Sequence, residues 1–206
     1  MDCMQHFPLI VCYYTQGTPY ALDVQGLKES CEKWNLAYQI EPIESFGSWE
    51  LNCCYKPFFL LSKLQELQRP LFWIDADAVI VRKPVPLAEF SMDLAVRIND
   101  SLALDHPSKV ISNSIFVNAT QEAALLLKRW ASICYSALTH PDRTEEYWDQ
   151  VGLRDAIFAS THNAKVVNLP HSYAAIYDHP IDNKEILEPI IQHTQASRRY
   201  KKLINS

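Results

Sequence analysis

Short apolar segments alternate along this chain with amphipathic ones, and this alternation constrains the fold more than any other feature. Residues 7–13 and 71–74 form continuous apolar runs, the pattern of strands that are buried on both faces. Residues 57–68 and 123–138 instead carry apolar side chains at helical spacing. Because strands alternate with helices, the sequence predicts an α/β domain with a mixed, mostly parallel central sheet flanked by helices.

The same patterns place the remaining elements. Asp23 is expected to cap a helix whose apolar stripe runs from Val24 to Trp34, and residues 52–56 are expected to be a loop that leads into the next helix. No repeat, low-complexity tract or linker divides the chain, so residues 1–206 are expected to form a single domain. Further strands are expected at residues 37–43, 94–98, 111–118 and 166–169.

Glycine is scarce in this chain, and that scarcity excludes several nucleotide-binding devices. The 206 residues include four glycines, Gly17, Gly26, Gly47 and Gly152, and no two of them are close together. A Walker loop, a Rossmann fingerprint and a kinase glycine loop all need clustered glycines, because the backbone must approach phosphates closely. If this protein handles a nucleotide, it does so by another arrangement.

The net charge and the cysteines of the chain indicate which binding partners and which cellular compartment to expect. With 19 basic and 24 acidic residues the net charge is −5, which disfavours nucleic acid as a partner. The six cysteines show no CxxC spacing, and several stand in apolar runs, so they are expected to be reduced thiols. The N-terminal apolar stretch is too short for a membrane span and lacks the basic residues of a signal peptide, so we expect a cytoplasmic protein with no membrane span.

An acidic pair directly follows the apolar run at residues 71–74. Asp75-Ala76-Asp77 stands beyond the carboxyl end of an expected strand, where a doubly wound sheet presents its ligand site. The period-two geometry of a strand would send both carboxylates to the same side. Two convergent oxygen ligands suit Mg²⁺ or Mn²⁺, with water and phosphate oxygens in the other positions. The alternative is a solvated strand end that happens to be acidic.

The segment around this pair resembles a known family. Residues 72–80, Phe-Trp-Ile-Asp-Ala-Asp-Ala-Val-Ile, are followed by Lys83-Pro84 and are similar to the DxD segment of nucleotide-sugar-dependent glycosyltransferases with the GT-A fold. More motifs match in the order of the glycogenin and galactosyltransferase-like group, glycosyltransferase family 8. They are Tyr-Lys-Pro-Phe-Phe-Leu at 55–60, Asn-Ser-Ile-Phe-Val-Asn at 113–118, Asp149-Gln150, and His193 with basic residues downstream.

The resemblance implies a GT-A-like fold and a role for each motif. Asp149 and Gln150 would contact the transferred sugar as the catalytic residues. Asp75 and Asp77, together with His193, would hold Mn²⁺ or Mg²⁺, which stabilises the charge that develops on a leaving nucleoside diphosphate. The nucleotide-sugar donor would be bound by Tyr14 and Thr15 at the end of the first strand and by Lys56, Asp75, Ala76, Asp77, Asn113, Arg198 and Lys201.

Several of these residues also have a plain structural interpretation. His193 would then be an ordinary surface histidine and Lys56 a solvated lysine. Asp149 would be favoured at a helix N-terminus by capping and by the helix macrodipole. Asn113 would make an internal hydrogen bond, and Tyr14 would be a core aromatic residue. The basic run at 198–202 would be a solvated tail.

The expectation that follows is a metal-dependent, retaining glycosyltransferase that moves a sugar from a nucleoside-diphosphate donor, a UDP-hexose, to an unknown glycan, lipid or protein acceptor. One alternative is a haloacid-dehalogenase-like phosphohydrolase, whose DxDx(T/V) motif residues 75–79 also resemble, although that motif normally follows the first strand of its fold. The other is a catalytically degenerate nucleotide-sugar-binding module. It is supported by the absence of the glycines that usually accompany the segments at Asn113 and His193 in the family.

Overall fold

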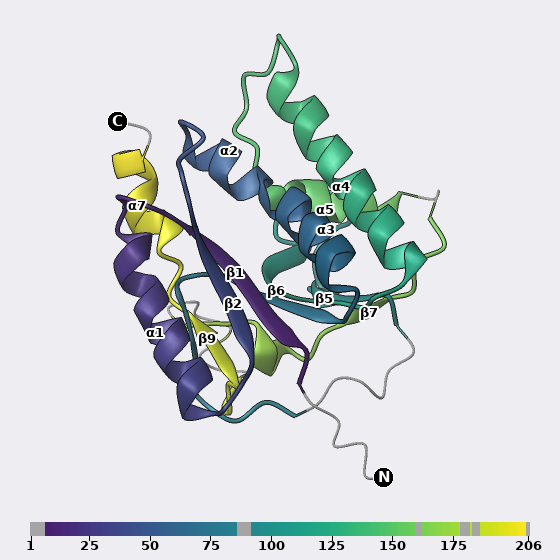
Figure 1. The fold of residues 1–206 in the computed structure, drawn as a ribbon. Helices are drawn as coiled ribbons and strands as arrows, with labels where there is room; N and C mark the ends of the chain where they lie inside the picture. The colour runs from purple at the N-terminus through teal and green to yellow at the C-terminus, as the bar shows by residue number, and fades with distance from the viewer. Residues whose placement is uncertain (1–6, 86–91, 160–161, 178–181, 183–185, 205–206) are drawn as a thin grey trace.

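The computed structural model describes residues 7–85, 92–159, 162–177, 182 and 186–204, with residues 201–204 described by their backbone alone. Helices lie on both sides of a central sheet (Figure 1). In chain order the elements are β1 (Leu9–Thr15), α1 (Tyr20–Lys33), β2 (Tyr38–Ile43), α2 (Trp49–Cys54), α3 (Lys56–Leu67), β3 (Leu71–Ile74), β4 (Ala78–Ile80), β5 (Leu94–Ile98), β6 (Val110–Val117), α4 (Gln121–Thr139), α5 (Asp149–Phe158), β7 (Val166–Asn168), the 3₁₀ helix η1 (His171–Tyr173), β8 (Ala175–Ile176), β9 (Ile191–His193) and α7 (Ser197–Ile204).

The central sheet has the strand order β2-β1-β3-β6-β5-β7. The pairs β1–β2, β1–β3 and β5–β7 are parallel, whereas β6 runs antiparallel to both β3 and β5. The predicted mixed, mostly parallel sheet flanked by helices is therefore confirmed. Because β6 is reversed, its first residues lie beside the carboxyl end of β3, where Ile74 pairs with Ser114. Polar residues from both strands can thus meet at one edge of the sheet.

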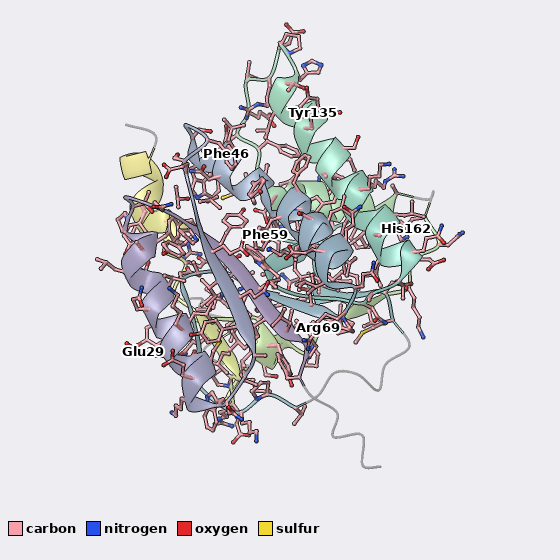
Figure 2. The ribbon with its side chains drawn as sticks, in the orientation of Figure 1. Glu29, Phe46, Phe59, Arg69, Tyr135 and His162 are labelled. Carbon is pink, nitrogen blue, oxygen red and sulfur yellow. The ribbon has the colours of Figure 1, made fainter. Side chains whose placement is uncertain are left out.

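Each face of the sheet has its own apolar core. Neighbouring residues of β3 point to opposite faces, so Phe72 belongs to the core under α1 and Trp73 to the core under α3 and α4. Both side chains are buried, which explains why residues 71–74 are apolar at every position. In Figure 2, Phe59 lies between α3 and the sheet, whereas Glu29 and Tyr135 project from the outer surfaces of α1 and α4.

A small second sheet is not predicted by the sequence patterns. Its strand order is β4-β9-β8, and each strand has only two or three residues, too few to show a period. Strand β4 begins directly after Asp77, and its first residue, Ala78, pairs with His193 at the end of β9. This sheet therefore places a histidine from the C-terminal part of the chain beside the acidic pair.

The structure corrects the expectation of a loop at residues 52–56. Trp49–Cys54 forms helix α2, and helix α3 begins at Lys56. Ser48 caps α2, because its side chain accepts a hydrogen bond from Leu51 N at 3.2 Å. A helix this short has no room for the repeating apolar stripe that identifies longer helices in a sequence.

Two expectations about helix ends are also corrected. Asp23 does not cap α1, because the helix begins at Tyr20 after Pro19, and Asp23 lies in its first turn. Proline is well suited to the start of a helix, since its φ is preset and it has no N–H to leave unpaired. The basic run at residues 198–202 is part of helix α7 and not a tail.

Two compositional expectations can be compared with the structure. The five described cysteines are all free thiols, and four of them are buried, as expected for reduced cysteines; Cys3 lies outside the described residues. No helix in the described part of the chain combines the length and apolarity that crossing a membrane requires.

Close packing between α4 and α5 depends on Gly152. A Cβ at this position would lie 2.7 Å from Cys134 Sγ and 3.2 Å from Trp130 Cδ1, and both side chains belong to the core. We expect Gly152→Ala to lower the free energy of unfolding by about 1–3 kcal/mol, because the core must move to admit a methyl group. Urea denaturation measures this change.

Gly26→Ala is the matched control, because Gly26 is also in a helix and its added methyl would meet only the partly exposed side chain of Val79, at 3.2 Å. It should be neutral or stabilising, since alanine is favoured over glycine by about 1 kcal/mol inside a helix. Equal effects of the two substitutions would contradict the packing argument.

Candidate active site

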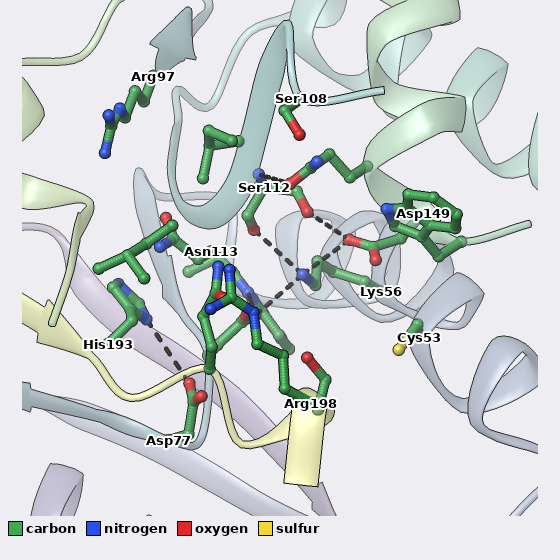
Figure 3. A pocket seen from close by; sticks show the side chains of 18 of the residues that line it. Cys53, Lys56, Asp77, Arg97, Ser108, Ser112, Asn113, Asp149, His193 and Arg198 are labelled. Carbon is green, nitrogen blue, oxygen red and sulfur yellow. Dashed lines mark hydrogen bonds and ion pairs between the residues drawn. The ribbon is translucent and has the colours of Figure 1, made fainter. Parts of the chain in front are cut away.

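A cavity of about 860 Å³ opens at the carboxyl ends of β1 and β3, beside the first residues of β6 (Figure 3). Residues from α2, α3, α5 and α7 complete its walls. Lys201 is in helix α7, but its side chain lies outside the described residues. All the other candidate site residues line this one cavity: Tyr14, Thr15, Lys56, Asp75, Ala76, Asp77, Asn113, Asp149, Gln150, His193 and Arg198.

The acidic pair occupies a turn between β3 and β4. Asp75 N donates a hydrogen bond to Asn113 O at 2.9 Å, and Ala78 N closes the turn by donating to Asp75 O at 3.1 Å. The expectation that strand periodicity aligns the two carboxylates is therefore wrong, because Asp75 and Asp77 are not in a strand. They converge because the chain reverses around Ala76.

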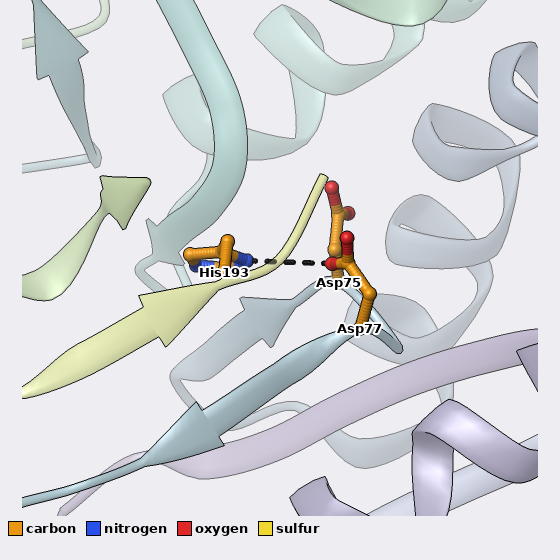
Figure 4. A group of neighbouring side chains, drawn as sticks. All are labelled: Asp75, Asp77 and His193. Atoms are coloured by element: carbon orange, nitrogen blue, oxygen red, sulfur yellow. Dashed lines mark ion pairs between the residues drawn. The ribbon is translucent and has the colours of Figure 1, made fainter. Parts of the chain in front are cut away.

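Asp75, Asp77 and His193 meet at one point of the cavity (Figure 4). Each offers a ligand atom, and the three atoms lie within 4.8 Å of one another. His193 is 1% exposed, so it is not a surface histidine. Its Nε2 is 3.0 Å from Ser114 Oγ, and its Nδ1 is 3.7 Å from Asp77 Oδ1. Ser114 thus fixes the ring so that Nδ1 faces the carboxylates, just as a hydrogen bond to the other ring nitrogen orients metal-binding histidines in general.

The two carboxylates are held in different electrostatic environments. Burial raises the pKa of Asp75, and the charges of Asp77 and Asp149 add to that rise against the opposing effect of Lys56. Burial also acts against ionised Asp77, but His193 and the N–H of Ala196, which donates to Oδ2 at 2.7 Å, together lower the pKa of Asp77. A cation between the two carboxylates would relieve their mutual repulsion.

Lys56 joins the acidic pair to the start of α5. Its Nζ lies 2.9 Å from Asp75 Oδ1 and 2.7 Å from Asp149 Oδ2, and it donates to Ser112 O at 3.1 Å. These contacts use all three ammonium protons. Burial acts to lower the pKa of Lys56, but Asp149 and Asp75 outweigh it and raise the pKa above its ordinary value. With 4% of its surface exposed, Lys56 is not a solvated lysine.

Asp149 and Gln150 form the first turn of α5 and are fixed by β6. Ser112 Oγ donates to Asp149 Oδ2 at 2.8 Å, and Ser112 N donates to Gln150 Oε1 at 3.3 Å. Trp130 Nε1 donates to the Asp149 carbonyl at 2.8 Å. Asp149 does not cap α5, whose N-cap residue is Trp148, although an acidic residue in the first turn does suit the helix dipole. Its carboxylate is instead aimed at Lys56 and the cavity.

The remaining candidates lie around the rim and floor of the cavity. Asn113 is 9% exposed, and its Oδ1 has no hydrogen-bond partner among the described residues, so this oxygen makes no internal hydrogen bond. Tyr14 and Thr15 end β1; Tyr14 is only partly buried, and Lys28 Nζ lies 5.4 Å from the centre of its ring. Arg198, at the start of α7, extends into the cavity (Figure 3).

Sequence reasoning missed the residues that hold the site in position. Ser112 and Ser114 bind Asp149 and His193 respectively, and Trp73 Nε1 donates to Asp75 Oδ1 at 2.7 Å. A signal for the serines was present, because they are polar residues inside an apolar strand and a buried hydroxyl needs a partner. For Trp73 there was none, since its apolar ring already accounts for its place in the core.

Removal of Lys56 should leave two carboxylates without their shared cation. We expect Lys56→Met to lower the free energy of unfolding at pH 7, in the presence of EDTA, by about 3–5 kcal/mol, because breaking a buried ion pair strands the opposite charge. The pKa of Asp75, already raised, would rise further without the ammonium. An acid with a raised pKa in the folded state destabilises the fold above that pKa. The loss in free energy of unfolding caused by Lys56→Met should therefore become smaller as the pH falls and the carboxyl of Asp75 binds a proton.

Lys63→Met in the same helix is the control. Its partners Glu41 and Glu66 are 42% and 55% exposed, so the loss should stay below about 1 kcal/mol. Urea titrations of both variants between pH 5 and pH 8 make the comparison. If both variants lost the same free energy of unfolding, or if the loss in Lys56→Met became larger at acidic pH, this account of the ion pairs would be contradicted.

Comparison with known proteins gives the fold a precedent. The chain is similar to a glycosyltransferase involved in glycosylation of the major capsid of PBCV-1, with a TM-score of 0.68, 12% identity, and coverage of 96% of this chain and 98% of that one. The glycosyltransferase GlyE of Streptococcus pneumoniae TIGR4 gives a TM-score of 0.59 and 11% identity, and the match covers 91% of this chain but 54% of GlyE.

The galactosyltransferase LgtC, solved with donor and acceptor sugar analogs, gives a TM-score of 0.52 and 9% identity over 95% of each chain. No family model matches the sequence, and no curated protein does. At such low identity the likeness concerns the fold, and it agrees with the fold that the motifs predicted. The chain has the GT-A glycosyltransferase fold.

Proposed function

We propose that this protein is a metal-dependent glycosyltransferase that transfers a hexose from a UDP-sugar to an acceptor with retention of anomeric configuration. The observation that carries the proposal is the convergence of Asp75, Asp77 and His193 in one cavity of this fold, beside the ion pair of Lys56 and Asp149. The acceptor is left open as a glycan, a lipid or a protein.

The three converging residues fit a divalent cation. The buried Nδ1 of His193 has no hydrogen-bond partner among the described residues, and it faces two carboxylates. Carboxylate oxygens suit both Mg²⁺ and Mn²⁺, while an imidazole ligand favours Mn²⁺ of the two. When bound, the cation would offset the negative charge that develops on the leaving nucleoside diphosphate.

The other cavity residues would contact different parts of such a donor. Tyr14 and Thr15 would contact the nucleoside at the end of β1, and Ala76 would lie against the donor between the two carboxylates. Arg198 on α7 would add positive charge beside the diphosphate, where cationic groups strengthen hydrogen bonds to phosphate oxygens. Lys201, on the same helix, is a second candidate for this role.

The sugar end of the donor would lie against Asn113, Asp149 and Gln150. The free Oδ1 of Asn113 can accept a hydrogen bond from a sugar hydroxyl. Lys56 would contact the donor only by giving up one of its protein partners, since its protons are all engaged. Asp149 Oδ2 is held by Lys56 and Ser112, which leaves Oδ1 of this carboxylate for the sugar.

The fold bears differently on the two alternative functions, a phosphohydrolase and a degenerate binding module. The glycosyltransferase fold gives no support to a haloacid-dehalogenase-like phosphohydrolase, because the acidic pair follows the third strand of the chain and β6 reverses direction in the sheet. A degenerate nucleotide-sugar-binding module has the same fold, and only turnover separates it from an enzyme. Donor binding without release of UDP, in hydrolysis or in transfer, would identify such a module.

A thermal-shift panel tests donor and metal together. UDP-, GDP- and ADP-sugars are added with and without MnCl₂, and we expect UDP-sugars with Mn²⁺ to raise the melting temperature most, because ligands of the folded state stabilise it in proportion to affinity. Asp77→Asn is the matched variant, since an amide oxygen can still accept from Ala196 N while the ligand charge is lost. It should lose the Mn²⁺-dependent shift. A shift that needs no metal, or persists in this variant, would contradict the proposal.

The stereochemical outcome is tested on the product. NMR of the sugar released by slow donor hydrolysis should show the anomer present in the donor as the first product, before mutarotation. Inversion would disprove the retaining mechanism and leave the glycosyltransferase assignment intact.

A further inference from the structure

The buried indole of Trp73 donates a hydrogen bond to Asp75, and the proposed function assigns this contact no role. Its Nε1 donates to Asp75 Oδ1 at 2.7 Å, and Lys56 Nζ lies 2.9 Å from the same oxygen. Trp73 is 2% exposed, whereas 34% of the Asp75 side chain is exposed toward the cavity. One oxygen of this carboxylate therefore has two strong donors, and the other is left to the cavity.

We propose that Trp73 is a positioning residue that makes Asp75 a one-oxygen ligand for the cation. With Oδ1 held by the indole N–H and the Lys56 ammonium, the carboxylate can offer only Oδ2 to an ion shared with Asp77 and His193. This inference rests on the proposed function, because it assumes that the three residues bind a metal.

The ring of Trp73 is fixed firmly enough to act in this way. It lies in β3 with Ile115 of β6 as its sheet partner. The ring of Tyr13 packs against it at a centroid distance of 5.0 Å and that of Phe59 at 5.9 Å, while Lys56 Nζ lies 5.1 Å from its centre. The N–H therefore stays where the fold puts it, and Asp75 must orient to meet it. Metal sites depend on outer contacts of this kind to fix the ligand geometry.

The arrangement has a consequence for metal choice. Small cations such as Mg²⁺ demand near-ideal octahedral geometry, which single-oxygen carboxylate ligands allow. The larger Ca²⁺ accepts carboxylates through both oxygens. By occupying Oδ1, Trp73 would favour the smaller cations over Ca²⁺. A hydrogen bond that served folding alone would affect stability without affecting this preference.

Trp73→Phe removes the N–H and keeps an aromatic ring in the core. Trp34→Phe is the control, because it deletes the same kind of donor away from the cavity: Trp34 Nε1 donates to Ile80 O at 2.9 Å. Binding of Mn²⁺ and Ca²⁺ to each purified protein is measured by calorimetry with the metal chlorides alone, so that no activity is needed.

We expect Trp73→Phe to raise the dissociation constant for Mn²⁺ at least about tenfold, because losing a group that orients a metal ligand typically weakens binding by about 10–100-fold, and to reduce the ratio of Mn²⁺ to Ca²⁺ affinity. The Trp34→Phe control should keep wild-type metal affinity. Wild-type affinity in Trp73→Phe, or an equal loss in Trp34→Phe, would overturn the inference. If the unmodified protein binds neither metal nor UDP-sugar, it is the proposed function that fails.

A second measurement needs no change at Trp73. The five tryptophan indole N–H signals of the ¹⁵N-labelled protein are assigned by elimination from Phe variants at the other four tryptophans and followed during addition of MgCl₂. The Trp73 signal should shift as Asp75 binds Mg²⁺, while the Trp34 signal should not. A Trp73 signal that ignores saturating Mg²⁺ would overturn the inference, even if Trp73→Phe fails to fold.

Discussion

The ion pairs of Lys56 hold the candidate site together. One buried ammonium lies between Asp75, at the end of β3, and Asp149, at the start of α5, and it also binds the backbone of β6. Without it, carboxylates from distant parts of the chain would repel one another in a poorly solvated cavity. Asp77 has no such ammonium partner among the described residues; it lies beside His193 and accepts a hydrogen bond from the N–H of Ala196. A divalent cation would complete this balance, and a donor diphosphate would share it.

The reversed strand β6 explains how so many polar groups reach one place. Ser112, Asn113 and Ser114 are consecutive, yet each serves a different partner: Asp149, the open cavity and His193. These residues lie at the carboxyl ends of β1 and β3 only because β6 enters the sheet from that edge. The site thus lies at the edge of the sheet where α/β proteins with parallel strands bind their ligands. The antiparallel strand β6 adds the hydrogen bonds that hold the site residues in place.

The C-terminal part of the chain closes the site from the other side. Ala196 N donates to Asp77 Oδ2, and Thr194 N donates to the Asp77 carbonyl at 3.3 Å. Helix α7 follows directly, and its Tyr200 ring packs edge-on against Tyr20 of α1 at a centroid distance of 5.5 Å. A segment that alone would be a charged tail is therefore anchored to the acidic turn at Asp75–Asp77 and to the first helix.

The sequence by itself determined the order of the main strands and helices, because their apolar patterns are long enough to show a period, and it selected the residues that line the cavity through the order of their motifs. It did not determine α2 or the small sheet, whose elements are too short for any period to appear. Only the tertiary structure decided why the acidic pair converges, which is a chain reversal at Ala76 and not strand periodicity. It alone also decided the partners of Lys56 and Ser112, because contacts between residues far apart in the chain depend on where the fold places both ends.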